Sequence, residues 1–217
     1  MAKIYLSAAA HAADRSTDCG VPYACSENTH CKEYMDLLEK RLNELGFEVR
    51  RGYQDETGDA ALDHRISDAN NWKADLYYIA HTNAGGGKYS MTMCYSDEYS
   101  QGLAGILSDY RKSAYDGNHK VVVNTALREI KNTSMVALYD ELYFHDDPEM
   151  NRWFHTGGME KMVEETCQAF CNIFDVAYLE DHKWYKVQVG AFRNREYAEA
   201  MRDELVSKGY DAFIKEE

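Results

Sequence analysis

Two histidines and two glutamates in this sequence have the types and positions that a catalytic metal site needs. His11, His81 and Glu141 each come at or just after the end of a short β-prone segment, and Glu27 comes in the first turn of a predicted helix. In an open α/β sheet, ligands bind beyond the carboxyl ends of the strands. The four side chains are therefore expected to meet on one rim of the sheet.

This set of residues matches the inventory of a catalytic zinc site. Such a site has three protein ligands, for example two histidines and one glutamate, and keeps a fourth position for water. Zinc lowers the pKa of that water to about 7 and polarises a carbonyl. A second carboxylate, which is not a ligand, can then take the proton and pass it to a leaving amine. The alternative is that these residues have structural roles only. The histidines would then be polar strand ends, and Glu27 would be a carboxylate that the helix dipole stabilises in the first turn.

Alternating strands and helices must position these residues. The order of strand, helix and strand predicts an α/β fold with a mostly parallel sheet flanked by helices. Asp-Pro-Glu at residues 147–149 is a strong signal for the start of a further helix. The predicted strands are residues 3–8, 47–50, 76–80, 121–123 and 134–141, and the predicted helices are residues 26–45, 60–72, 97–112 and 158–174.

The last 36 residues differ from the rest in charge and in pattern. They contain 7 basic and 7 acidic residues, whereas the first 181 residues contain 17 basic and 30 acidic ones. An alternating segment at 184–189, an amphipathic helix at 195–208 and a further strand at 210–214 predict a small β-α-β unit. A unit of this size is too small to fold well alone. We therefore expect one domain at 1–178 and a C-terminal unit at 182–217.

Composition narrows the class of protein. The chain has 217 residues, of which 45% are hydrophobic and 28% charged, as in ordinary globular proteins. No apolar run approaches the ~18 residues of a membrane span, so we expect no membrane insertion. The net charge of −13 argues against a nucleic-acid partner, because phosphate contacts need clustered lysine and arginine. The N-terminal segment fits a buried strand better than a signal peptide.

The six cysteines offer a second possible metal site, which we do not favour. Cys19, Cys25 and Cys31 are each six residues apart, which is not the spacing of a zinc knuckle. Cys167 and Cys171 share one face of a predicted helix, as core residues do. We therefore expect reduced thiols.

Over about residues 1–175, the sequence resembles the zinc-dependent N-acetylmuramoyl-L-alanine amidases of bacterial cell-wall hydrolases and phage endolysins. The matching segments are KIYLSAAAH, LNELGFEVRRG, ALDHRISDANNWKADLYYIAHTNAGGG and MVALYDELYFHDDPEM. The resemblance implies a phosphorylase/hydrolase-like fold and a Zn²⁺ ion bound by His11, Glu27 and His81. It also implies that Glu141 activates water against the amide that joins N-acetylmuramic acid to L-alanine.

Two motifs depart from the pattern of that family. The family usually has Asp-Pro-Gly-His-Gly around the first ligand, where this chain has Ala-Ala-Ala-His-Ala at residues 8–12. The family often has Glu-x-Gly-Phe around the catalytic acid, where this chain has Glu-Leu-Tyr-Phe at residues 141–144. Neither change removes a ligand or the acid. Asn83 and Arg128 are further candidates for substrate contact, although a surface salt bridge is the alternative role of Arg128.

The C-terminal unit resembles the first half of a sporulation-related repeat (SPOR) domain, through VQVGAF at residues 187–192. This resemblance implies binding to glycan strands stripped of peptide, with Gln188 and Phe192 as candidate contacts. A full domain contains two such halves. We expect the half to complete a sheet with a second copy in a homodimer, or else to dock on the first domain.

These features together predict a peptidoglycan hydrolase that uses zinc-activated water to cleave the amide between N-acetylmuramic acid and L-alanine. The enzyme would contact both the glycan strands and the stem peptide. The expected setting is a phage endolysin that is made in the cytoplasm and reaches the wall at lysis, and a lytic enzyme of a sporulating mother cell would look the same. Two other functions stay open. They are a zinc peptidase that acts within the stem peptide, and a peptidoglycan-binding protein without catalysis.

Overall fold

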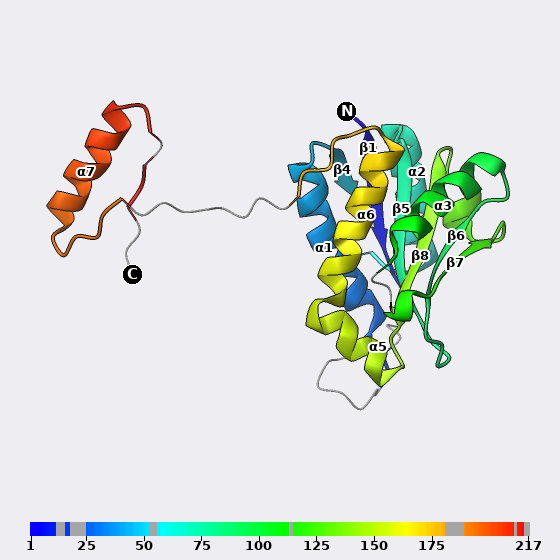
Figure 1. Ribbon diagram of the computed structural model, residues 1–217. Helices are drawn as coiled ribbons and strands as arrows, with labels where there is room; N and C mark the ends of the chain where they lie inside the picture. Colours follow the sequence, from blue (N-terminus) through cyan, green and yellow to red (C-terminus); the bar gives the residue numbers. More distant parts are fainter. Residues whose placement is uncertain are drawn as a thin grey trace. The chain divides into compact units, whose positions relative to one another are not determined.

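The computed structural model describes residues 1–11, 16–17, 25–52, 56–112, 115–180, 189–210 and 212–214. The chain divides into two compact units, Met1–Leu179 and Glu180–Glu217 (Figure 1).

A six-stranded sheet forms the centre of the first unit, with strand order β4-β1-β5-β8-β6-β7 (Figure 1). β1 pairs in parallel with β4 and β5, and β5 pairs in parallel with β8. β6 runs antiparallel to β8 and parallel to β7. The predicted mostly parallel sheet is therefore confirmed. The strands are β1 (Lys3–Ala8), β4 (Glu48–Arg51), β5 (Leu76–Asn83), β6 (Ser90–Cys94), β7 (His119–Val123) and β8 (Val136–Phe144).

Helices cover both faces of this sheet. One hydrophobic cluster joins the sheet to α1, α3 and α6, and a smaller cluster joins the other face to α2 and α4. Among the described residues, no helix has both the length and the apolar character to cross a membrane. The helices are α1 (Glu27–Glu44), α2 (Gly58–Trp72), α3 (Glu98–Tyr110), α4 (Arg128–Lys131), α5 (Pro148–Trp153) and α6 (Met159–Ile173).

Helix α1 forms where its sequence signals place it. The Ser26 side chain caps the helix by accepting a hydrogen bond from the Thr29 amide at 3.1 Å. Gly46 follows the last turn with φ of +87°, a conformation that glycine adopts without steric cost. The apolar positions of the helical stripe are fully buried against the sheet: Cys31, Tyr34, Met35, Leu38 and Leu42.

Two strands differ from the prediction in ways that affect the site. β5 continues to Asn83 and β8 continues to Phe144, so His81 and Glu141 lie inside strands rather than at their ends. The expectation that Glu141 terminates its strand was wrong, because three further buried residues continue β8, and the last of them, Phe144, pairs with Asn83. The prediction also omitted β6, whose short sequence SMTMC has no aliphatic run and is held only by its neighbours.

A buried polar network lies on the α1/α6 side of the sheet. Arg111 and Asp140 form an ion pair in which neither side chain is exposed. The Tyr78 hydroxyl donates to Asp140 at 2.6 Å, and the Thr92 hydroxyl donates to the other carboxylate oxygen at 3.2 Å. His119 extends the network through a 3.0 Å hydrogen bond between its Nε2 and the Thr92 hydroxyl. Each buried charge thus has a partner, as stability requires.

The second unit contains α7 (Arg195–Ser207), which confirms the predicted helix. The Asn194 side chain caps it by accepting from the Glu196 amide at 2.9 Å. No residue of α7 is buried. The predicted strand at 184–189 lies almost wholly outside the described residues, and Gln188 with it. In the segment 210–214, the four described residues are not part of a strand.

Candidate active site

The first candidate ligand follows the end of β1 in a turn held by backbone hydrogen bonds. The Ala9 amide donates to the carbonyl of Ala80 at 2.9 Å, which ties the turn to the neighbouring strand β5. The Gly58 amide donates to the carbonyl of Ala10 at 2.8 Å, which ties it to the start of α2. His11 comes next, and its side chain is 32% exposed. The ring is therefore presented at the edge of the sheet.

His11, Glu27 and His81 come together at this edge. Their candidate donor atoms all lie within 4.8 Å of one another. One Glu27 oxygen lies 3.1 Å from His11 Nε2, and the other lies 2.8 Å from His81 Nδ1. The Thr82 amide also donates to Glu27, at 3.2 Å. Burial by itself raises the pKa of Glu27, but the hydrogen bond from His81, the two imidazoles and the Thr82 amide together lower it.

The chemistry of these three residues fits a zinc ion. Zinc bonds of about 2.0–2.2 Å in a tetrahedral site place neighbouring ligand atoms about 3.3–3.6 Å apart. The separations of 3.1 and 2.8 Å are shorter hydrogen-bond distances, and each involves a different oxygen of Glu27, so the three side chains converge on one point without being spaced as zinc ligands. Two imidazole nitrogens and one carboxylate oxygen are also a usual zinc donor set. Because Glu27 is 3% exposed and His81 is 8% exposed, two of the three donors are already shielded from solvent.

Glu141 lies beside this cluster on the next strand. It is the register partner of His81 in the β5–β8 pair. Burial raises the pKa of Glu141 to about 7, and the negative charges of Glu27 and Asp140 add to the effect, whereas His81 opposes it. Its Oε2 atom is buried and has no hydrogen-bond partner among the described residues. A carboxyl group with these properties can exchange a proton near neutral pH.

An aromatic ring supports the second histidine. The ring of Tyr139 stacks on that of His81, with centroids 4.5 Å apart and planes 21° apart. The His11 ring meets the His81 ring edge-on at 5.2 Å. Burial raises the pKa of Tyr139, as do the nearby charges of Glu141 and other carboxylates. The sequence carried a signal for this residue, because strand alternation places Tyr139 on the same face as Glu141.

A second group of buried residues was missed by the sequence analysis. The hydroxyls of Ser7 and Tyr77 both donate to Glu129 Oε1 at 2.7 Å. Arg65 donates to the Ser7 hydroxyl at 3.1 Å and to the carbonyl of Ala8 at 2.6 Å. The network therefore anchors the end of β1 just before the first candidate ligand. No local pattern could reveal it, because the residues of each hydrogen-bonded pair are 52 to 122 positions apart in the sequence.

The glycine-rich loop after β5 is fastened to the segment that follows β8. The amides of Gly85 and Gly86 donate to the Asp146 carboxylate at 2.7 and 3.2 Å. The Lys88 ammonium donates to Glu149 at 2.7 Å. The loop is thus held next to the strand that carries Glu141.

Two of the other candidates for substrate contact, Asn83 and Arg128, have hydrogen-bond or ion-pair partners within the protein. Asn83 ends β5, and its side chain accepts a hydrogen bond from the next amide in its own loop, that of Ala84, at 2.8 Å. Arg128 forms surface ion pairs with Asp59 at 3.4 Å and Asp63 at 3.2 Å. Phe192 is 43% exposed in the second unit.

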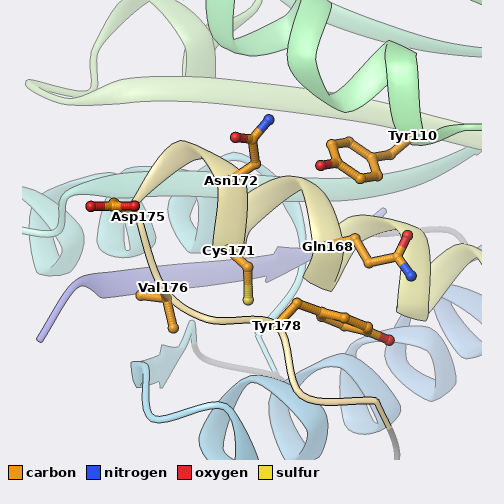
Figure 2. Close-up of a pocket in the computed structure, with 7 residues that line it drawn as sticks. All are labelled: Tyr110, Gln168, Cys171, Asn172, Asp175, Val176 and Tyr178. Atoms are coloured by element: carbon orange, nitrogen blue, oxygen red, sulfur yellow. The ribbon is translucent and has the colours of Figure 1, made fainter.

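A cavity of about 360 Å³ lies beside the C-terminal end of α6 and the segment that follows it (Figure 2). It contains none of the candidate ligands or Glu141. The cavity is lined by Tyr110, Gln168, Cys171, Asn172, Asp175, Val176 and Tyr178.

Comparison with known proteins identifies relatives for both units. A family model described as N-acetylmuramoyl-L-alanine amidase matches residues 8–172, and one described as SPOR domain matches residues 178–217. The chain is 26% identical over 162 residues to the N-acetylmuramoyl-L-alanine amidase CwlM of Bacillus licheniformis. It is 24% identical over 165 residues to the sporulation-specific N-acetylmuramoyl-L-alanine amidase of Bacillus subtilis (strain 168). Each match covers 71% of this chain and 62% of the relative, so the chain spans less than two thirds of their length.

Solved structures show the same fold. The catalytic domain of the amidase CwlV from Bacillus (Paenibacillus) polymyxa var. colistinus matches with a TM-score of 0.70 at 18% identity. That match covers 82% of this chain and 100% of the other. The catalytic domain of the CD27L endolysin, which targets Clostridia difficile, matches with a TM-score of 0.67 at 19% identity, over 79% of this chain and 98% of the other.

Proposed function

Since the chain belongs to the N-acetylmuramoyl-L-alanine amidase family, we propose that it hydrolyses the amide between N-acetylmuramic acid and L-alanine in peptidoglycan. One observation carries this proposal. His11, Glu27 and His81 form a cluster that could hold a metal ion, and Glu141 lies in register with His81. A protein that only binds peptidoglycan needs neither the ligands nor an adjacent carboxyl group with a raised pKa.

We propose Zn²⁺ as the metal, held by His11, Glu27 and His81. When bound, zinc would polarise the amide carbonyl and lower the pKa of a water molecule. The chain contributes the orientation of the donors. Glu27 stays ionised because its pKa is lowered, and the stacked ring of Tyr139 limits rotation of the His81 imidazole.

Glu141 is the proposed general base and general acid. It accepts a proton from the attacking water as the oxygen–carbon bond forms at the lactyl carbonyl. It then donates that proton to the L-alanine nitrogen as the carbon–nitrogen bond breaks. The products are the lactyl carboxyl group and a free amine. A pKa of about 7 suits a group that must take up and release a proton at neutral pH.

We propose that the C-terminal unit binds glycan strands, and that it also pairs with the same unit of a second copy in a homodimer. The SPOR match over residues 178–217 supports wall binding. The absence of buried residues from α7, with Tyr197 65% and Val206 53% exposed, supports a further partner for this surface. Light scattering that gives a monomer at micromolar concentration would contradict the dimer.

We also propose that the protein acts on the wall at lysis, as a phage endolysin or a mother-cell enzyme. The similar proteins include both an endolysin and a sporulation-specific amidase. Expression in the cytoplasm of a susceptible cell should leave the cell intact until the membrane is permeabilised. Lysis without permeabilisation would contradict this setting.

Mass spectrometry of peptidoglycan digested by the zinc-loaded protein tests the reaction. Free stem peptides that begin with L-alanine, together with peptide-free glycan, are the expected products. A new amine inside the stem peptide would identify a peptidase instead. Intact muropeptides, together with a protein that retains no zinc after loading, would point to a binding protein.

A further inference from the structure

We infer that Asn28 is a positioning residue, which fixes the backbone of His11 to the helix that carries Glu27. This inference rests on the proposed metal function of His11 and Glu27. Asn28 immediately follows Glu27 in the first turn of α1. Its role is different from that of the ligands, because its two hydrogen bonds to His11 are with the main chain of that residue.

The contact is reciprocal. The His11 amide donates to Asn28 Oδ1 at 3.1 Å, and Asn28 Nδ2 donates to the His11 carbonyl at 3.0 Å. The carboxamide of asparagine offers a donor and an acceptor on separate atoms, and glutamine would carry the same group one methylene further from the helix backbone. The Asn28 side chain therefore satisfies both backbone polar groups of His11, as a paired strand would do.

His11 needs such support more than the other ligands do. Its side chain is 32% exposed, against 3% for Glu27 and 8% for His81, so packing restrains its ring least. It also lies beyond the end of β1, where the sheet no longer holds the backbone. The preceding turn is fixed at Ala9 and Ala10 by backbone hydrogen bonds, and Asn28 continues this restraint to the ligand itself.

The anchor is itself rigid. The Ser26 side chain caps α1 by accepting from the Thr29 amide, so the first turn is closed on both sides of Asn28. The side chain thereby links two ligands that come from different elements. Metal ligands must be held to within about 0.5 Å of their productive positions. Loss of the hydrogen bonds that orient a ligand typically lowers metal affinity about 10–100-fold.

Zinc affinity, measured by competition with a chromophoric chelator, tests the inference with Asn28→Ala and Asn28→Gln. Both should bind zinc at least about 10-fold more weakly than the unchanged protein. The visible absorption of bound Co²⁺, which reports its coordination geometry, should also change. The melting temperature of the metal-free protein shows whether each variant is folded, and the glutamine variant covers the case in which alanine does not fold.

Asn70→Ala is the matched control. Asn70 also bridges the backbone, since Nδ2 donates to the Asn132 carbonyl at 3.1 Å and Oδ1 accepts from the Ser134 amide at 2.8 Å. It contacts none of the ligands. Its loss should leave zinc affinity and the Co²⁺ spectrum unchanged.

Three results would overturn the inference. The first is affinity within about threefold of the unchanged protein in both Asn28 variants. The second is equal weakening in the Asn70 control. The third is an unchanged protein that binds no zinc. This result would contradict the proposed metal function as well, and the missing zinc in the unchanged protein distinguishes it from the first result.

Discussion

His81 and Glu141 are paired in register on the parallel strands β5 and β8. The pairing places a proposed metal ligand and the proposed general base side by side in the sheet, just before the register of the two strands shifts between His81 and Asn83. Tyr139, two residues before Glu141, stacks on the His81 ring from the same strand. The relative position of the two reacting groups is therefore set by strand register rather than by a loop.

Replacing Glu141 should abolish hydrolysis and leave the metal bound. Glu141→Ala and Glu141→Gln both remove the proton acceptor, whereas the three ligands stay in place. The expected loss in kcat is about 100-fold or more. Zinc content and product release from muropeptides are the measurements, with the exposed Glu48→Gln as control. Turnover close to that of the unchanged protein would show that another group is the base.

Replacing His81 should remove both metal and activity, because two ligands cannot hold the ion that three do. Zinc content after dialysis measures the loss. His64→Ala is the matched control, since His64 is 61% exposed on α2 and its ion pair is with Glu56. A His81→Ala protein that retains one zinc per chain would contradict the assignment of this ligand.

His119 should make the folded state less stable as pH falls. Burial lowers the pKa of His119 to about 4, and Arg111 adds to this, whereas Asp140 opposes it. The ring stays neutral between the Ser90 hydroxyl at 2.7 Å and that of Thr92 at 3.0 Å. Below pH 6.5 the unfolded state takes up a proton that the folded state does not, so stability is lost on going toward pH 4.

The expected loss from His119 between pH 7.5 and pH 5 is about 2 kcal/mol. Denaturant unfolding of the unchanged protein and of His119→Gln at these two pH values isolates the contribution. Between these two pH values, the free energy of unfolding of the variant should fall by about 2 kcal/mol less than that of the unchanged protein. Equal losses in both proteins would show that the histidine is not kept neutral by the fold.

Asp140→Asn should destabilise the fold, by about 3–5 kcal/mol, because it leaves the Arg111 charge buried without its counter-charge. The free energy of unfolding in urea measures this. Asp63→Asn, which loses only a surface pair with Arg128, should cost less than about 1 kcal/mol. A small effect of Asp140→Asn would mean that Arg111 finds another partner or that water reaches it.

Removing the C-terminal unit after Leu179 should leave hydrolysis of soluble muropeptides within about twofold, because the first unit is compact by itself. Binding to whole sacculi should fall, since the second binding module is lost. Cosedimentation with sacculi measures the binding. Unchanged cosedimentation would contradict a wall-binding role for residues 180–217.

Local sequence signals determined individual helices and strands of this protein and the choice of its candidate site residues. The cap at Ser26, the apolar stripe of α1 and the glycine that ends it predict that helix from neighbouring residues alone. The continuous apolar run at 76–80 predicts a central buried strand, and the structure has β5 there between β1 and β8. His11, Glu27, His81 and Glu141 could be singled out because strand ends and helix starts are where polar side chains gather in an α/β fold.

Only the tertiary structure decided how those residues meet. Asp140 and Glu141 are neighbours in sequence, yet strand alternation sends one into a buried ion pair with Arg111 and the other to the edge that carries His81. The strand β6 exists because β8 and β7 supply its hydrogen bonds, not because of its own composition. Contacts such as that between Asn28 and His11 join residues whose separation in sequence says nothing of their distance, and long-range packing alone brings them together.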